Sequence, residues 1–206
     1  MEVPLHWSTP PAWAELALEQ PQALLSDHAH CELGAAASAQ SMLLRRPGDA
    51  RLVESMGALA VEELQHFRRV NRLLRSNSWS LAPAEKNPYV SGLHRILKQD
   101  HASGVSQTTP DYDASIVDRL LVAALIERRS LERFELLAEA DSDGDIGRLY
   151  AELGPSEAGH ARLFVELAQR FGPPDQVTAR QGELSRAEGE LIQGLPSGPR
   201  IHAGPA

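Results

Sequence analysis

Four segments of the chain place an apolar side chain at every third or fourth position, which is the spacing of one face of an α-helix. They span residues 25–42, 52–73, 113–138 and 146–171. Steps of three and four are typical of helices that pack side by side around a shared core. Composition agrees, because 29 Leu and 28 Ala outnumber 10 Val and 6 Ile, and the first two favour helices over sheets. The sequence therefore predicts an all-α fold built on a four-helix bundle.

Proline and glycine positions indicate how these helices are connected. Pro47-Gly48 ends the first segment, so the first two helices should run antiparallel across a short turn. The second and third segments are separated by a stretch long enough to cross the bundle. We expect a weaker helix inside this crossover, Tyr89 to Gln99, and two flanking helices, Trp13 to Glu19 and Gln176 to Gln193.

The chain is long enough for one domain with a substantial core, which we expect over residues 1–193. Residues 194–206 are rich in Pro and Gly and are expected to form a flexible C-terminal tail. Pro155 lies inside the fourth segment and lacks a backbone N–H, so it predicts a kink or a break at Gly154-Pro155.

Several features point to a cytoplasmic protein. No apolar run is long enough to cross a membrane. The first basic residue is Arg45, so we expect no targeting segment with a charged start. The single cysteine, Cys31, excludes an internal disulfide and any four-cysteine metal site, which fits a reducing compartment.

Glutamates interrupt the four apolar faces, where an unpaired carboxylate would cost much free energy. Each face carries one, and in two of them a histidine follows three residues later on the same side of the helix. In chain order the set is Glu32, then Glu63 with His66, then Glu127, then Glu157 with His160. Ferritin-like di-iron carboxylate bundles carry their ligands in this same order: one Glu, a Glu-x-x-His pair, one Glu and a second Glu-x-x-His pair.

The composition of this set predicts which ions it would bind. Four carboxylates balance the charge of two divalent ions, and carboxylates with imidazoles suit iron or manganese better than zinc or copper. We therefore expect two iron ions, with manganese as the second choice. The competing interpretation is a set of buried salt bridges, but no basic residue stands near the carboxylates on these four faces.

Two further side chains fall near the predicted site. His28 precedes Glu32 by one helical turn, and it could hydrogen-bond a ligand, add a ligand, or pack in the core as a neutral histidine. Tyr150 lies two turns from Glu157 and could either hydrogen-bond near the site or simply pack. Cys31 adjoins Glu32 but points off the apolar face, so we assign it no role.

The stretches that carry these residues resemble one family. They are Asp27–Glu32, Glu62–Phe67, Ile126–Phe134 and Ser156–His160. Together they are similar to the tRNA methylthio-hydroxy-isopentenyladenosine hydroxylases, the MiaE family, and the resemblance runs from about residue 24 to residue 171.

This resemblance implies an iron- and oxygen-dependent monooxygenase with the six residues holding two irons. Its substrate would be the prenylated, methylthiolated adenosine beside a tRNA anticodon. One oxygen atom would enter a methyl C–H bond of the isopentenyl group, and the other would leave as water. The two electrons would come from a separate reductase or ferredoxin, because the chain has no flavin or iron–sulfur motif.

The charge distribution allows an RNA partner even though the net charge is −8. Residues 68–98 hold seven basic residues against one acid, and the arginine fork suits phosphate. Trp79 and Tyr89 lie among them and could stack on unpaired bases or pack on the bundle. The candidate tRNA-binding residues are Arg68, Arg69, Arg72, Arg75, Lys86, Tyr89, Arg95 and Lys98.

Two other functions remain possible from sequence. A ferritin-like iron store or peroxide-handling protein would form large cages and take up many irons per chain. A helical binding module would hold no metal at all. The hydroxylase interpretation instead predicts a monomer or small homo-oligomer with about two irons per chain.

Overall fold

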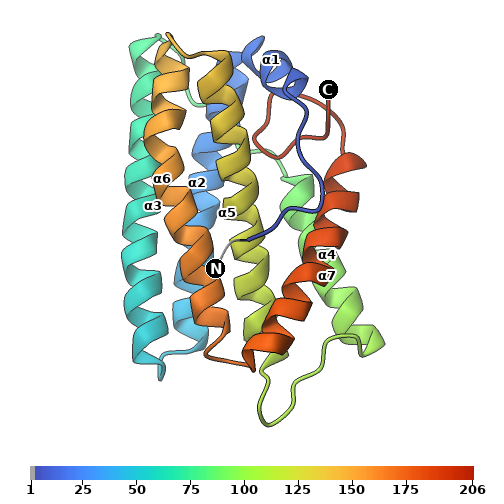
Figure 1. Cartoon of the computed structure of the whole chain (residues 1–206). Helices are drawn as coiled ribbons and strands as arrows, with labels where there is room; N and C mark the ends of the chain where they lie inside the picture. Colours follow the sequence, from blue (N-terminus) through green and yellow to red (C-terminus); the bar gives the residue numbers. More distant parts are fainter. Residues whose placement is uncertain (1–2) are drawn as a thin grey trace.

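The computed structural model describes residues 3–206 and contains seven α-helices and no strand within that range (Figure 1). The helices are α1 (Ala12–Leu18), α2 (Pro21–Arg45), α3 (Ala50–Ser76), α4 (Pro88–Ser103), α5 (Ala114–Ala140), α6 (Asp145–Ala168) and α7 (Pro174–Gln193). The all-α prediction is confirmed.

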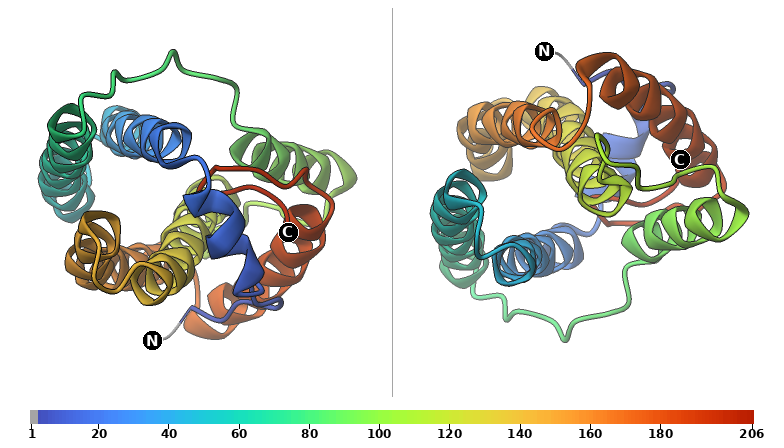
Figure 2. Two further views of the ribbon diagram at one scale, coloured as in Figure 1. Left: turned by 90° about the horizontal axis from the view of Figure 1, so that it is seen from above. Right: turned by 90° about the horizontal axis from the view of Figure 1, so that it is seen from below.

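Helices α2, α3, α5 and α6 form the four-helix bundle, and its closest packing lies within two antiparallel hairpins, α2 with α3 and α5 with α6. The end-on views of Figure 2 show the crossover after α3 passing outside α2 to reach α4. Helices α1, α4 and α7 flank the bundle on the side of α5. The fold is therefore ferritin-like, with the long connection between the second and third bundle helices that the sequence predicts.

Polar side chains fix where three helices begin. Asp49 accepts a hydrogen bond from the backbone N–H of Leu52 (2.8 Å) at the start of α3. Asn87 accepts from Val90 (3.1 Å) at the start of α4, and Asp113 caps α5 in the same way. Each cap satisfies an N–H that has no partner within its helix. The short α2–α3 turn and the α4 start therefore follow from local sequence.

The proline inside α6 does not break the helix. Helix α6 runs without interruption from Asp145 to Ala168, and Pro155 lies on its exposed side. The carbonyl that loses its hydrogen bond is that of Ala151, which is also exposed, so water can satisfy it. Of the kink or break predicted at Gly154-Pro155, the break is absent.

The last residues of the chain are packed, contrary to the flexible tail expected from their composition. Ile201, His202 and Ala203 are buried. The N–H of Ile201 donates to Asp27 of α2 (2.9 Å), and Arg133 of α5 donates to the carbonyl of Ile201 (2.5 Å). The tail therefore docks on two bundle helices through partners that lie far away in sequence.

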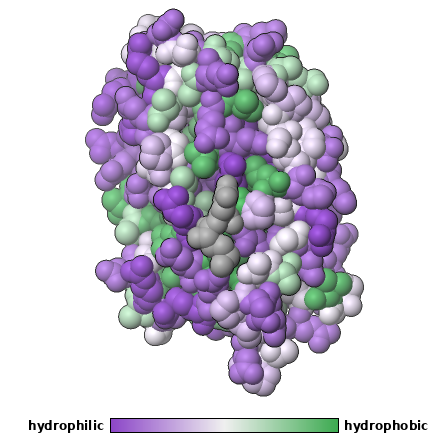
Figure 3. Space-filling model, in the orientation of Figure 1, coloured by the Kyte–Doolittle hydropathy of each residue, from purple (hydrophilic) through white to green (hydrophobic). Residues whose placement is uncertain are grey.

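The face drawn in Figure 3 is largely hydrophilic, with apolar residues scattered among charged ones. Within residues 3–206 no helix combines the length and apolar character needed to cross a membrane.

Candidate metal centre

The six predicted ligands meet in the core of the bundle, and all four bundle helices contribute. Glu32 comes from α2, Glu63 and His66 from α3, Glu127 from α5, and Glu157 and His160 from α6. Glu63 is fully buried, and none of the other five is more than 6% exposed. Each side chain projects inward because it occupies a position on the apolar face of its helix.

The ligand atoms fall into two groups that share Glu63. In the first group, atoms of Glu32, Glu63, His66 and Glu157 lie within 4.8 Å of one another, and in the second, atoms of Glu63, Glu127 and His160 lie within the same distance of one another. Each group contains residues from both hairpins, α2–α3 and α5–α6. Each half of the chain supplies three of the six residues at nearly equal spacing, 31 residues from Glu32 to Glu63 and 30 from Glu127 to Glu157, but the two groups do not coincide with the two halves.

Several polar atoms of the cluster have no hydrogen-bond partner. Both carboxylate oxygens of Glu63, Nδ1 of His66, one oxygen of Glu157 and both ring nitrogens of His160 are buried and make no hydrogen bond of good geometry, although His160 Nε2 lies 3.2 Å from Glu62 Oε2. His160 Nδ1 lies 2.9 Å from Glu63 Oε1, and His66 Nδ1 lies 3.4 Å from Glu157 Oε1. Buried polar atoms without partners are costly, and metal ions between them would satisfy them. The residues present therefore fit a di-metal site.

Bound protons balance the negative charge of the carboxylate cluster when no metal ion is bound. Burial raises the pKa of Glu32 and of Glu127 well above the usual range. Burial opposes a charge on His66, but contacts with Glu157, Glu32 and Glu63 raise its pKa to about 12. The pKa of His160 rises to about 9 through its contact with Glu63, again against the effect of burial. Metal binding would replace these protons, as is usual for carboxylate and histidine ligands.

His28 lies directly behind this centre. Its Nε2 is 2.5 Å from Glu32 Oε1, and its ring packs edge-on against Phe134 and stacks on Tyr150. Burial lowers the pKa of His28 to about 4, so its ring is neutral. Of the three roles left open by the sequence, the hydrogen bond to a ligand fits this geometry. The Tyr150 hydroxyl has no hydrogen-bond partner, which favours packing for that residue.

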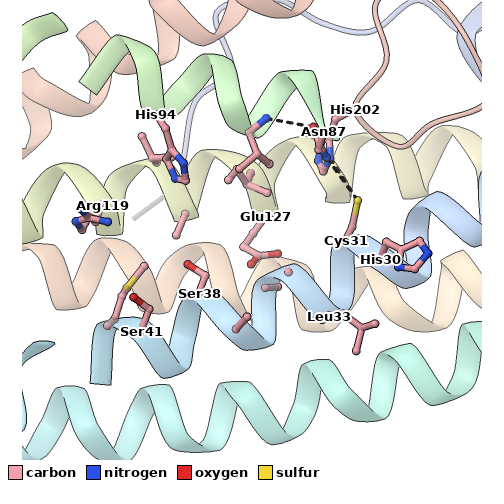
Figure 4. Close-up of a pocket in the computed structure, with 18 of the residues that line it drawn as sticks. His30, Cys31, Leu33, Ser38, Ser41, Asn87, His94, Arg119, Glu127 and His202 are labelled. Atoms are coloured by element: carbon pink, nitrogen blue, oxygen red, sulfur yellow. Dashed lines mark hydrogen bonds between the residues drawn. The ribbon is translucent and has the colours of Figure 1, made fainter. Parts of the chain in front are cut away.

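A cavity of about 730 Å³ lies beside the cluster, between α2, α4 and α5. Figure 4 shows Glu127 at its centre, so one candidate ligand faces open space. Much of the wall is apolar and includes Met42, Leu97, Val122, Ala123, Ile126 and Phe164. Cys31 also lines the cavity, which sequence analysis missed because its position off the apolar face gave no signal.

Comparison with known proteins decides the family. The sequence matches the family described as tRNA-(MS[2]IO[6]A)-hydroxylase (MiaE) over residues 2–203. The chain belongs to the MiaE family. A relative from Pseudomonas putida named tRNA 2-(methylsulfanyl)-N(6)-isopentenyladenosine(37) hydroxylase is 38% identical over 197 residues, which cover 95% of this chain and 90% of the relative.

A second relative with that name, from Salmonella typhimurium, is 31% identical over 159 residues, or 77% of this chain and 54% of the relative. Among solved structures, the chain is similar to protein 43 with aldehyde deformylating oxygenase activity from Synechococcus. The TM-score is 0.86 at 33% identity, with 100% of this chain and 98% of the other covered. The MiaE chain thus shares its ferritin-like fold with an oxygenase.

The residues that sequence analysis proposed for tRNA binding lie outside the cavity of this MiaE member. Six of them are exposed: Arg68, Arg72, Arg75, Lys86, Arg95 and Lys98. Arg69 is only partly exposed and forms an ion pair with Glu152.

Tyr89 cannot stack on a base, so its proposed role in tRNA binding is wrong. It is fully buried, its hydroxyl donates to Glu188 (2.9 Å), and its ring stacks on His202 at 4.6 Å. Trp79 is half-buried and packs against the apolar cluster at the α1 end of the bundle.

Proposed function

We propose that this chain is a non-haem di-iron monooxygenase that hydroxylates the isopentenyl group of methylthio-isopentenyladenosine in tRNA. One observation carries the proposal: the buried six-residue cluster faces a largely apolar cavity through Glu127. A prenyl group needs an apolar site, and its methyl C–H bonds need a strong oxidant held close to them. Family membership supports tRNA as the carrier of that group.

In this proposal Glu32, Glu63, His66, Glu127, Glu157 and His160 hold two iron ions, which supply the oxidising chemistry when dioxygen and two electrons are available. Carboxylate and imidazole ligands favour iron, with manganese second. The electrons come from an external reductase or ferredoxin, since the sequence carries no flavin or iron–sulfur motif.

The protein itself positions the substrate and excludes water. Met42, Val122 and Phe164 belong to the apolar wall of the cavity in which the isopentenyl group would lie. Apolar walls keep water away from the reacting carbon, and a fixed orientation presents one methyl group to the metal centre. The exposed residues Arg68 and Arg72 are proposed to contact the outer parts of the tRNA. We further propose a cytoplasmic location, because tRNA would be the substrate, and a monomer or small homo-oligomer.

The direct test is nucleoside analysis of tRNA before and after incubation with iron-loaded protein, a reductant and oxygen. We expect the methylthio-isopentenyladenosine peak to fall and its hydroxylated product to rise by the same amount. Parallel samples without iron, without oxygen, or with a fatty aldehyde in place of tRNA serve as controls. Aldehyde consumption with unchanged tRNA would contradict the proposal and favour the activity named for the Synechococcus protein. Large cages that hold many irons per chain would favour the storage alternative.

A further inference from the structure

The cavity has two chemically different ends. In Figure 4, Cys31, Asn87 and His202 lie to one side of Glu127, and Ser41 and Arg119 lie to the other. Cavity residues on the first side include acids, and those on the second side include arginines. An anionic ligand would therefore meet different potentials at the two ends.

The charges at the Cys31 end are already satisfied inside the protein. Asp27 accepts a hydrogen bond from the backbone of Ile201 (2.9 Å), and Glu85 forms an ion pair with Arg200. Buried His202 belongs to the docked tail at this end and contacts Cys31 and Ser130. Among the described residues, no arginine or lysine lines the cavity at this end.

The other end carries two arginines whose charges are free. Arg45, at the C-terminal end of α2, and Arg119, on α5, both line the cavity and are exposed. Among residues 3–206 neither has a carboxylate partner, and the one side-chain contact of Arg45 is with Ser41 Oγ (3.4 Å). Two helix-capping acids, Asp113 and Asp49, are already paired with other arginines: Asp113 with Arg46, and Asp49 with Arg170 (3.2 Å).

The spacing between this end and the metal centre suits a nucleotide. Arg119 and Glu127 are eight residues apart on α5, which corresponds to about 12 Å along the helix axis. That span is comparable to the distance from the phosphate of a prenylated adenosine nucleotide to the end of its prenyl chain. Small side chains on α2, at Gly34, Ala37 and Ser38, leave open the wall between the two points.

We propose that Arg45 and Arg119 bind the RNA phosphates next to the prenylated adenosine and so set the direction in which the nucleotide enters the cavity. This inference rests on the proposed function. A guanidinium binds phosphate through two parallel N–H···O bonds, which fix orientation as well as supply charge. Because the whole chain is acidic, with a net charge of −8, close approach of RNA requires such a local basic site.

The test measures binding of an anticodon stem–loop RNA that carries isopentenyladenosine, over a range of salt concentrations. R45E and R119E should each weaken binding by about tenfold or more, and each should lower the slope of log affinity against log salt by about one. R162E is the matched control, because Arg162 is exposed on α6 and lies outside this cavity. Iron content and helix content should be the same in all variants.

The outcomes separate this inference from the proposed function. If R45E and R119E bind RNA as tightly and with the same salt slope as R162E, the phosphate site is wrong, even when the wild-type protein hydroxylates tRNA. If the wild-type protein leaves the tRNA nucleoside unchanged, the proposed function fails whatever the arginine variants do. An equal loss in R162E would also overturn the inference, because it would show a general charge effect.

Discussion

Replacing Glu63 with alanine is expected to remove both metal ions and to abolish hydroxylation of tRNA. Glu63 is the one residue that belongs to both groups of ligand atoms, and it is fully buried between them. Loss of a residue that only orients a ligand commonly costs 10- to 100-fold, so loss of a shared ligand should cost more than about 100-fold. Metal analysis of the purified protein and nucleoside analysis of treated tRNA measure the two effects.

The matched control is Glu54→Ala, because Glu54 is an exposed glutamate on the same helix, α3. It should retain about two metal ions per chain and wild-type turnover. Glu63→Ala should still fold, because in the metal-free protein it removes one carboxylate from a buried cluster of four, which relieves their repulsion and offsets the lost contact with His160. Full metal content in Glu63→Ala would contradict the account of a shared ligand.

Filling the cavity from α2 is expected to block the substrate without disturbing the metal. A Cβ atom built on Gly34 meets nothing within 4 Å, although this residue lies in the middle of a helix, where glycine costs about 1 kcal/mol relative to alanine. Helix packing therefore does not require glycine there. Gly34→Trp should lower kcat/KM for tRNA by about 100-fold, because even small displacements of a reacting group are expensive.

The same substitution at Gly182 provides the control. Gly182 lies on α7, also has open space around its Cβ, and does not line the cavity. Gly182→Trp should leave turnover unchanged, while Gly34→Trp keeps its full iron content but loses turnover. Equal activity of the two variants would show that the cavity between α2, α4 and α5 is not the substrate site.

The clustering of the candidate ligands was predictable from sequence because their signal is local. A glutamate on an apolar helical face is costly, and a histidine three residues later lies on the same side, so the sequence alone marks Glu63 and His66 as a site. How the ligands divide between two groups was not predictable. That division depends on which helices face each other across the bundle.

Features that need distant partners escaped the sequence analysis. The packing of Ile201 depends on Asp27 and Arg133, which no local pattern connects to the tail. Arg45 and Arg119 look like ordinary helix-surface residues until α2 and α5 bring them to one end of a cavity. A count of basic and acidic residues along the sequence favoured the stretch from Arg68 to Lys98 instead. Such a count detects only charges that lie close together in the sequence.

Anomalous X-ray diffraction from crystals of the iron-loaded protein tests the central claim most directly. The account predicts two iron peaks inside the bundle, one among Glu32, Glu63, His66 and Glu157, and the other among Glu63, Glu127 and His160. Iron bound elsewhere, or no iron between these side chains in a protein that still hydroxylates tRNA, would contradict it.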